Sequence, residues 1–142
     1  MRNKTIKKDE QPKISIYIDF ASIDNIELVK KIIENAKSIG KVVKTRVYFL
    51  QDEFEGHKNS VEEILSIGVE PIITMLAKDV KLAIDILDDS YDDEISIILL
   101  AYRYDSLLPA LIDAKNRKTV YLIDLGGLSE ALKNIADELI KV

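Results

Sequence analysis

Three aspartates of this 142-residue chain stand where carboxylates could hold a metal ion. Asp19 ends an apolar, β-branched run, Asp79 opens a helical pattern after another apolar run, and Asp105 closely follows the run "IILLA". Mg²⁺ and Mn²⁺ bind carboxylate oxygens together with water, and a metal held in this way activates water for attack on a phosphodiester. A single aspartate at a helix start is more often an N-cap. It is therefore the convergence of all three that would make a metal site.

Polar and aromatic residues beside these aspartates are candidates for modulating the site or contacting a substrate. Lys78 directly precedes Asp79. Tyr102 and Tyr104 flank Arg103, and their rings could stack on the bases of single-stranded RNA. Packing at a strand end is an equally good interpretation of the two rings. These residues extend the candidate site without defining its chemistry.

Strands and helices alternate along the chain and predict how these residues are positioned. Apolar, β-branched runs predict strands at residues 14–20, 41–50, 69–76, 94–101 and 118–125. Helical spacing of apolar residues predicts helices at residues 25–40, 60–68, 77–90, 106–117 and 128–142, with a polar loop at 51–59. This alternation predicts an α/β fold, a three-layer α/β/α sandwich on a parallel sheet of about five strands. Ligands of such sheets bind beyond the carboxyl ends of the strands, where the three aspartates fall.

Composition excludes several kinds of site. The chain has no cysteine and one histidine, which excludes disulfides, thiolate metal sites and histidine clusters. No apolar run approaches the roughly 20 residues of a membrane helix, so we expect no membrane partner and a cytoplasmic location. The net charge of −5 means that RNA would have to meet a local basic patch. Residues 1–13 are polar and basic and predict a flexible tail before a single domain at residues 14–142.

Several segments, in order, resemble the NYN domain family, the PIN-like nuclease group that includes the LabA-like proteins. "ISIYIDFASI" resembles the opening strand of the family and "KTRVYF" its second strand. "SIGVEPI", "AKDVKLAIDIL", "IILLAYRYDSLLPALIDAKNRKTVYLI" and "LKNIADELIKV" resemble the later segments, so that the resemblance covers nearly all of residues 14–142. Together with the alternation of elements, it implies a PIN-like, Rossmann-like sheet ordered 3-2-1-4-5.

The resemblance also implies an activity, a Mg²⁺- or Mn²⁺-dependent ribonuclease that uses clustered aspartates on RNA. Asp19 corresponds to the acid of the first strand and Asp79 to the acid at the helix start. Asp85 corresponds to the second acid of that helix, although Lys81 four residues earlier makes it fit an ordinary solvated stripe as well. The resemblance thus assigns Asp19, Asp79 and Asp105 to catalysis and metal binding.

Two positions depart from the family pattern. Ser22 stands where the family usually has an asparagine, and the segment written S-G-D-S-D keeps only Asp105 of its two acids. Arg103 occupies the position of the missing acid. Because a guanidinium is always charged and pairs readily with carboxylates, we expect Arg103 to reach the edge formed by Asp19 and Asp79 and to replace the metal there. The alternative is that Arg103 faces solvent and pairs with Asp105.

Three functional hypotheses follow from these departures. The first is a metal-dependent endoribonuclease of weakened activity. The second is a catalytically inactive PIN-like module that binds RNA or a protein partner. The third is a structural subunit that forms a homodimer through its apolar closing helix or an open edge of the sheet.

Overall fold

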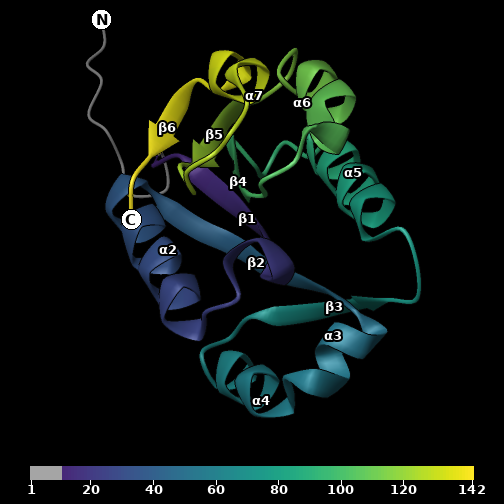
Figure 1. Ribbon diagram of the computed structural model, residues 1–142. Helices are drawn as coiled ribbons and strands as arrows, with labels where there is room; N and C mark the ends of the chain where they lie inside the picture. The colour runs from purple at the N-terminus through teal and green to yellow at the C-terminus, as the bar shows by residue number, and fades with distance from the viewer. Residues whose placement is uncertain (1–10) are drawn as a thin grey trace, which may run out of the picture.

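The computed structural model describes residues 11–142 and contains a six-stranded sheet in the order β3-β2-β1-β4-β5-β6 (Figure 1). Every neighbouring pair of strands runs parallel. The predicted α/β fold and the order 3-2-1-4-5 are confirmed, and β6 extends the sheet by one strand. The expected tail lies outside the described residues at positions 1–10, and Lys13, predicted as its last residue, begins the first strand.

The elements have the following bounds. The strands are β1 (Lys13–Asp19), β2 (Lys41–Leu50), β3 (Glu70–Thr74), β4 (Ile97–Ala101), β5 (Thr119–Ile123) and β6 (Glu138–Ile140). The helices are α1 (Phe20–Ile23), α2 (Ile26–Ile39), α3 (Gln51–Gly56), α4 (Lys58–Ser66), α5 (Lys78–Asp89), the 3₁₀ helix η2 (Asp105–Leu107), α6 (Leu108–Ala114) and α7 (Glu130–Ile135). None of the helices within residues 11–142 is long and apolar enough to cross a membrane.

Helices cover both faces of the sheet, so the central strands carry apolar side chains on both sides. Ile16 and Ile18 of β1 pack in one cluster with α2 and α4, whereas Tyr17 packs in the other with α5, α6 and α7. Successive side chains of a strand point to opposite faces, which is why one buried strand serves both layers. The central strand β1 is thereby packed between the two layers of helices, and it carries Asp19 at its carboxyl end.

The closing helix predicted at residues 128–142 is confirmed only over Glu130–Ile135, and the prediction is wrong for the residues that follow. Helix α7 stops at Ile135, and β6 then adds to the free edge of β5 (Figure 1). Asp137 makes the change, because its backbone N–H donates to the carbonyl of Val120 while its carboxylate accepts the Val120 N–H, both at 2.8 Å. The edge of a sheet offers unpaired backbone N–H and C=O groups, and hydrogen bonding to them outweighs the helical preference of this segment. The dimer hypothesis consequently loses its closing helix, while a homodimer through a sheet edge stays a prediction.

The polar loop predicted at residues 51–59 is also wrong, because α3 and the start of α4 occupy it. The first turn of α3 is held by Glu53, whose carboxylate accepts the backbone N–H of Leu50 at 2.7 Å. Capping of this kind satisfies a donor that the first helical turn leaves free. The cap also brings a carboxylate to the carboxyl end of β2, beside the end of β1.

Candidate functional site

The candidate site lies at the carboxyl end of β1, where the chain order of the strands changes direction across the sheet. Strand β1 is flanked by β2 on one side and by β4 on the other, which is the switch point where open α/β sheets bind their ligands. Asp19 ends the strand with its side chain 2% exposed. Helix α1 begins at the next residue, and its one turn brings Ser22 back so that the Ser22 hydroxyl donates to Asp19 Oδ2 at 2.7 Å.

Lys78 provides the cation of this site. Its ammonium lies 2.5 Å from Asp19 Oδ1 and 2.7 Å from Glu53 Oε1, so that it bridges two carboxylates carried by different elements. The Lys78 side chain is only 10% exposed, which makes the bridge largely inaccessible to water. Toward Glu53 the contact is an aligned hydrogen bond, whereas Asp19 Oδ1 has the ion pair but no aligned donor. Oxygen atoms of two carboxylates are thus directed at the same ammonium.

The electrostatics of the bridge keep Lys78 charged. Burial by itself would lower the pKa of the Lys78 ammonium, but its close contacts with the Asp19 and Glu53 carboxylates, and their negative charges, outweigh burial and raise the pKa above its ordinary value. The lysine therefore stays an ammonium across the physiological range of pH. It cannot act as a general base, because it does not lose its proton there.

Asp79 is the neighbour of Lys78 on α5, but its carboxylate turns to the helix. It is half-buried and accepts the backbone N–H of Val80 at 2.9 Å, as a carboxylate in the first turn does. Its charge still reaches the site, since burial raises the pKa of the Tyr102 hydroxyl and the carboxylates of Asp79 and Asp19 raise it further. Asp79 thus lies at the rim, with its carboxylate bound to the first turn of its own helix.

Asp105 is directed elsewhere. It is exposed at the start of η2, four residues beyond β4, and its carboxylate accepts the Ser129 hydroxyl at 2.6 Å. Strands β1 and β4 are neighbours as predicted, yet the expected convergence of Asp19, Asp79 and Asp105 is not found. Over residues 11–142, no group of three or more acidic, histidine or cysteine side chains could hold a metal ion. A divalent cation does not fit the site as folded, because the Lys78 ammonium lies between its two carboxylates.

The prediction that Arg103 reaches the edge of Asp19 and Asp79 is wrong. Its guanidinium donates to the carbonyl of Ser22 at 2.8 Å, to that of Leu125 at 3.1 Å and to that of Gly126 at 2.9 Å. Its backbone N–H also donates to the Ser22 hydroxyl at 3.2 Å. Backbone carbonyls at the carboxyl edge, rather than the carboxylates, bind the guanidinium. Arg103 thus ties the turn after β1 to the turn after β5, and the alternative pairing with Asp105 is not found within the described residues.

The two tyrosines beside Arg103 have different environments. Tyr102 is buried, and its hydroxyl shares a hydrogen bond of 2.6 Å with the Ser106 hydroxyl. Tyr104 is 55% exposed and packs against Tyr102 edge-on, with 5.6 Å between the ring centroids. Of the pair, only Tyr104 offers a free aromatic face at this edge.

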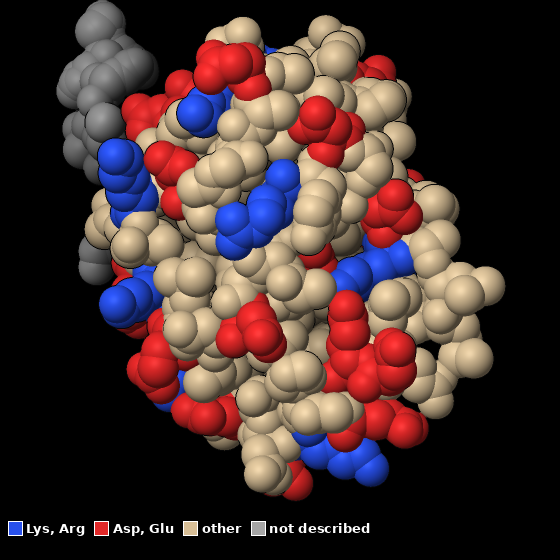
Figure 2. Space-filling model, in the orientation of Figure 1, with Lys and Arg blue, Asp and Glu red and all other residues tan. Residues whose placement is uncertain are grey.

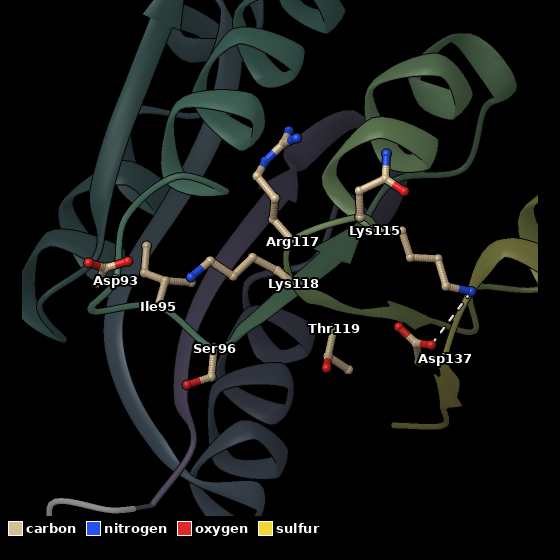
Figure 3. Close-up of a pocket in the computed structure, with 9 residues that line it drawn as sticks. Asp93, Ile95, Ser96, Lys115, Arg117, Lys118, Thr119 and Asp137 are labelled. Atoms are coloured by element: carbon tan, nitrogen blue, oxygen red, sulfur yellow. Dashed lines mark ion pairs between the residues drawn. The ribbon is translucent and has the colours of Figure 1, made fainter.

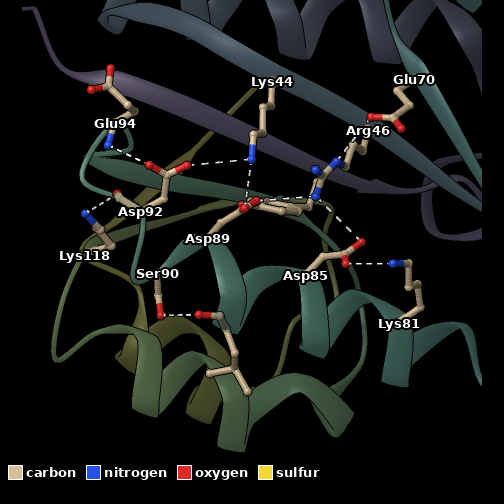
Figure 4. Close-up of polar contacts among 12 residues, drawn as sticks. Lys44, Arg46, Glu70, Lys81, Asp85, Asp89, Ser90, Asp92, Glu94 and Lys118 are labelled. Carbon is tan, nitrogen blue, oxygen red and sulfur yellow. Dashed lines mark hydrogen bonds and ion pairs between the residues drawn. The ribbon is translucent and has the colours of Figure 1, made fainter.

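Asp85 is part of a separate buried network, so the interpretation as a solvated stripe is wrong (Figure 4). It accepts the Tyr48 hydroxyl at 2.8 Å and the Lys81 ammonium at 2.9 Å. One turn further along α5, Asp89 accepts the Tyr17 hydroxyl and the Lys44 ammonium, and Arg46 lies within 4 Å of both aspartates. Burial first, and then these hydrogen bonds, raise the pKa of both tyrosines. The network attaches α5 to β1 and β2 and thereby holds Lys78, the first residue of that helix, against Asp19.

The residue of the site that the sequence did not indicate is Glu53. It belongs to the stretch predicted as a loop, and the signal that could have identified it is its position three residues after the end of a strand, where an acidic residue can cap a helix. Lys78 was expected only to modulate the site, yet it provides the central charge. Both contacts join segments that are far apart in the sequence.

A cavity of about 540 Å³ lies away from this site at the amino ends of β4 and β5 (Figure 3). Lys115, Arg117 and Lys118 line it, but each already has protein partners. Lys118 donates to the carbonyl of Asp92 at 2.8 Å, Lys115 to that of Ile135 at 2.6 Å, and Arg117 pairs with Asp113 at 2.8 Å. The cavity is thus a polar cleft whose cations are structural.

Comparisons with known proteins identify a family, a relative and a solved structure of the same fold. A family model described as the NYN domain matches residues 13–142. The uncharacterized protein MJ0482 of Methanocaldococcus jannaschii is 32% identical over 145 residues, covering 98% of this chain and 59% of that protein. The chain thus spans about three fifths of the length of this relative. A crystal structure of VPA0982, a protein of unknown function from Vibrio parahaemolyticus, has the same fold at a TM-score of 0.78 and 17% identity, with 96% of each chain covered.

Proposed function

Because the chain belongs to the NYN domain family, a group of PIN-like nuclease domains, we propose that it binds single-stranded RNA at the carboxyl edge of its sheet without cleaving it by a metal-dependent route. The RNA partner is what the family suggests. The absence of cleavage is what the side chains of this chain support. The intact Mg²⁺- or Mn²⁺-dependent ribonuclease, with Asp19, Asp79 and Asp105 as its ligands, is the competing function.

One observation carries the proposal, the position of the Lys78 ammonium against Asp19. A metal-dependent nuclease needs an open coordination position at its buried acid, where the cation can hold water and phosphate. Here that acid is bridged to Glu53 by a fixed positive charge, and the other two expected ligands bind a helix N–H and a serine hydroxyl. The function that remains for this edge is to bind RNA without cleaving it.

Residues for recognition lie on the same edge. Tyr104 offers an exposed ring on which a base can stack. The neighbouring Arg103 ties the turn after β1 to the turn after β5. Positive and negative side chains are interspersed on the face that Figure 2 shows. Electrostatic attraction is therefore local and small in extent, so we expect weak RNA binding that falls as salt is added.

The test is to measure binding and cleavage in the same samples. A fluorescent single-stranded RNA is titrated with the protein at low salt, once in EDTA and once in Mn²⁺, and the RNA is then run on a denaturing gel. We expect equal binding in both buffers, no cleavage in either, and weaker binding at each step of added salt. Cleavage in Mn²⁺ that disappears in the Asp19→Asn variant would establish the nuclease instead, and absence of binding at low salt would remove RNA as the partner.

A further inference from the structure

We infer that Lys78 is the built-in counter-ion of a latent divalent-cation site, whose ligands are the carboxylates of Asp19 and Glu53. The inference rests on the proposed function, because it explains why the edge does not cleave, but it concerns cation binding alone. Removing the ammonium would expose a site for Mn²⁺ or Mg²⁺ that the native chain keeps closed.

The geometry is that of a cation held between two oxygen ligands. Asp19 comes from the end of β1, Glu53 from the first turn of α3 and Lys78 from the first residue of α5. The ammonium lies 2.5 Å from one carboxylate and 2.7 Å from the other. Both carboxylates are held in place independently of Lys78, since Ser22 donates to Asp19 and Leu50 donates to Glu53. Without the ammonium, the two acids would still face the same point.

The charges make that point attractive to a cation. Two carboxylates share one ammonium, so the three side chains carry a net charge of −1. Asp19 Oδ1 is buried, and the Lys78 ammonium is the partner that the described residues give it, so removal of Lys78 would leave this oxygen facing the vacated position. Buried carboxylates that lose their counter-ion are strongly destabilising, and Mn²⁺ binds one or two carboxylates and completes its shell with water.

The backbone before Lys78 supports its placement. Ala77 has a φ of +53°, in the left-handed region that residues other than glycine seldom adopt. This conformation turns the chain that follows β3 into α5, so that the helix starts at Lys78. The Lys78 side chain then points to the carboxyl edge of the sheet, where it meets Asp19. Such a conformation persists only where surrounding contacts hold it, and the two ion pairs of Lys78 are contacts of that kind.

The decisive experiment compares Lys78→Ala with the native chain in titrations with MnCl₂, followed by calorimetry and by thermal melting. We expect Lys78→Ala to melt at a lower temperature than the native chain in EDTA and to regain stability in Mn²⁺. Its dissociation constant for Mn²⁺ should be at least tenfold below that of the native chain. Lys81→Ala is the matched control, because it removes an ammonium from the same helix that pairs with Asp85 instead. It should leave Mn²⁺ binding unchanged.

A second pair of variants identifies the ligands and covers a failure to fold. Adding Asp19→Asn to Lys78→Ala should abolish the gain in Mn²⁺ binding, since the buried ligand is then neutral. If Lys78→Ala folds only when Mn²⁺ is present, that dependence itself supports the site. The inference is overturned if Lys78→Ala binds Mn²⁺ no more tightly than the native chain, or if Lys81→Ala gains as much.

The two proposals can fail separately. RNA binding by the native chain in EDTA involves no divalent cation, so it tests the proposed function alone. Mn²⁺ binding by Lys78→Ala is measured without RNA, so it tests the latent site alone. Tight Mn²⁺ binding by the native chain, lost in Asp19→Asn, would contradict both.

Discussion

Replacing Asp89 by alanine should lower the free energy of unfolding by about 2–4 kcal/mol. Asp89 is the buried acid of α5 that receives the Tyr17 hydroxyl, the Lys44 ammonium and, at 3.5 Å, the Arg46 guanidinium (Figure 4). The change removes all three contacts at once. It tests whether the polar network, rather than apolar packing alone, attaches α5 to the sheet.

The magnitude follows from what each partner loses. Tyr17 is fully buried, so its hydroxyl is left without a partner, which costs about 1–3 kcal/mol. Lys44 is 34% exposed and can be hydrated, so its loss is discounted to at most about 1 kcal/mol. Arg46 keeps Asp85 and Glu70 as partners and adds little. Asp89→Asn, which keeps an acceptor for Tyr17, should cost only about 1 kcal/mol.

The assay is urea unfolding followed by far-ultraviolet circular dichroism, since the chain has no tryptophan. Tyr17→Phe removes the hydroxyl itself and should cost about 1 kcal/mol. Combining it with Asp89→Ala should then cost less than the sum of the two single changes, because the buried hydroxyl is no longer left unpaired. If Asp89→Ala lies within about 0.5 kcal/mol of the native chain, or if the two changes are additive, the network does not hold α5 as argued.

Three further outcomes test the edge of the sheet. The pKa of Lys78 is raised above its ordinary value of 10.5, so its ion pairs stabilise the fold fully below that pH and lose their effect as the pH rises through the folded-state pKa. The difference in melting temperature between the native chain and Lys78→Met should therefore shrink above pH 10.5. A difference that stays constant would contradict this. Arg103→Ala removes three hydrogen bonds to backbone carbonyls and should lower the free energy of unfolding in urea by about 1–3 kcal/mol. Amide hydrogen exchange should become faster in residues 124–129. Unchanged exchange there would show that Arg103 does not hold this segment. Tyr104→Ala should weaken RNA binding by about 1–3 kcal/mol, the value of one stacked base, without changing the melting temperature. Replacing Tyr91, another exposed tyrosine, by alanine should leave RNA binding unchanged. Equal losses of binding in the two variants would exclude stacking at the edge.

Much of the fold could be predicted from the sequence, because it depends on local patterns. Apolar runs alternating with helical spacing require parallel strands joined by crossover helices, and the end of the first run places Asp19 at the carboxyl edge. The exceptions are the segments where a neighbour decided the conformation. The chain after Ile135 has a helical pattern, but a free edge of β5 and the two bonds between Asp137 and Val120 make it a strand.

The identity of the cation in the candidate site is what only the tertiary structure decided. Arg103 and Lys78 both stand near the end of a strand in the sequence, and either could have met Asp19. Loop carbonyls beyond β1 and β5 take the Arg103 guanidinium, while the network on α5 places the first residue of that helix against Asp19. Glu53 completes the bridge from a third element. Residues 19, 53 and 78 come together only because three separately packed elements meet at one edge, and no spacing along the chain encodes that distance.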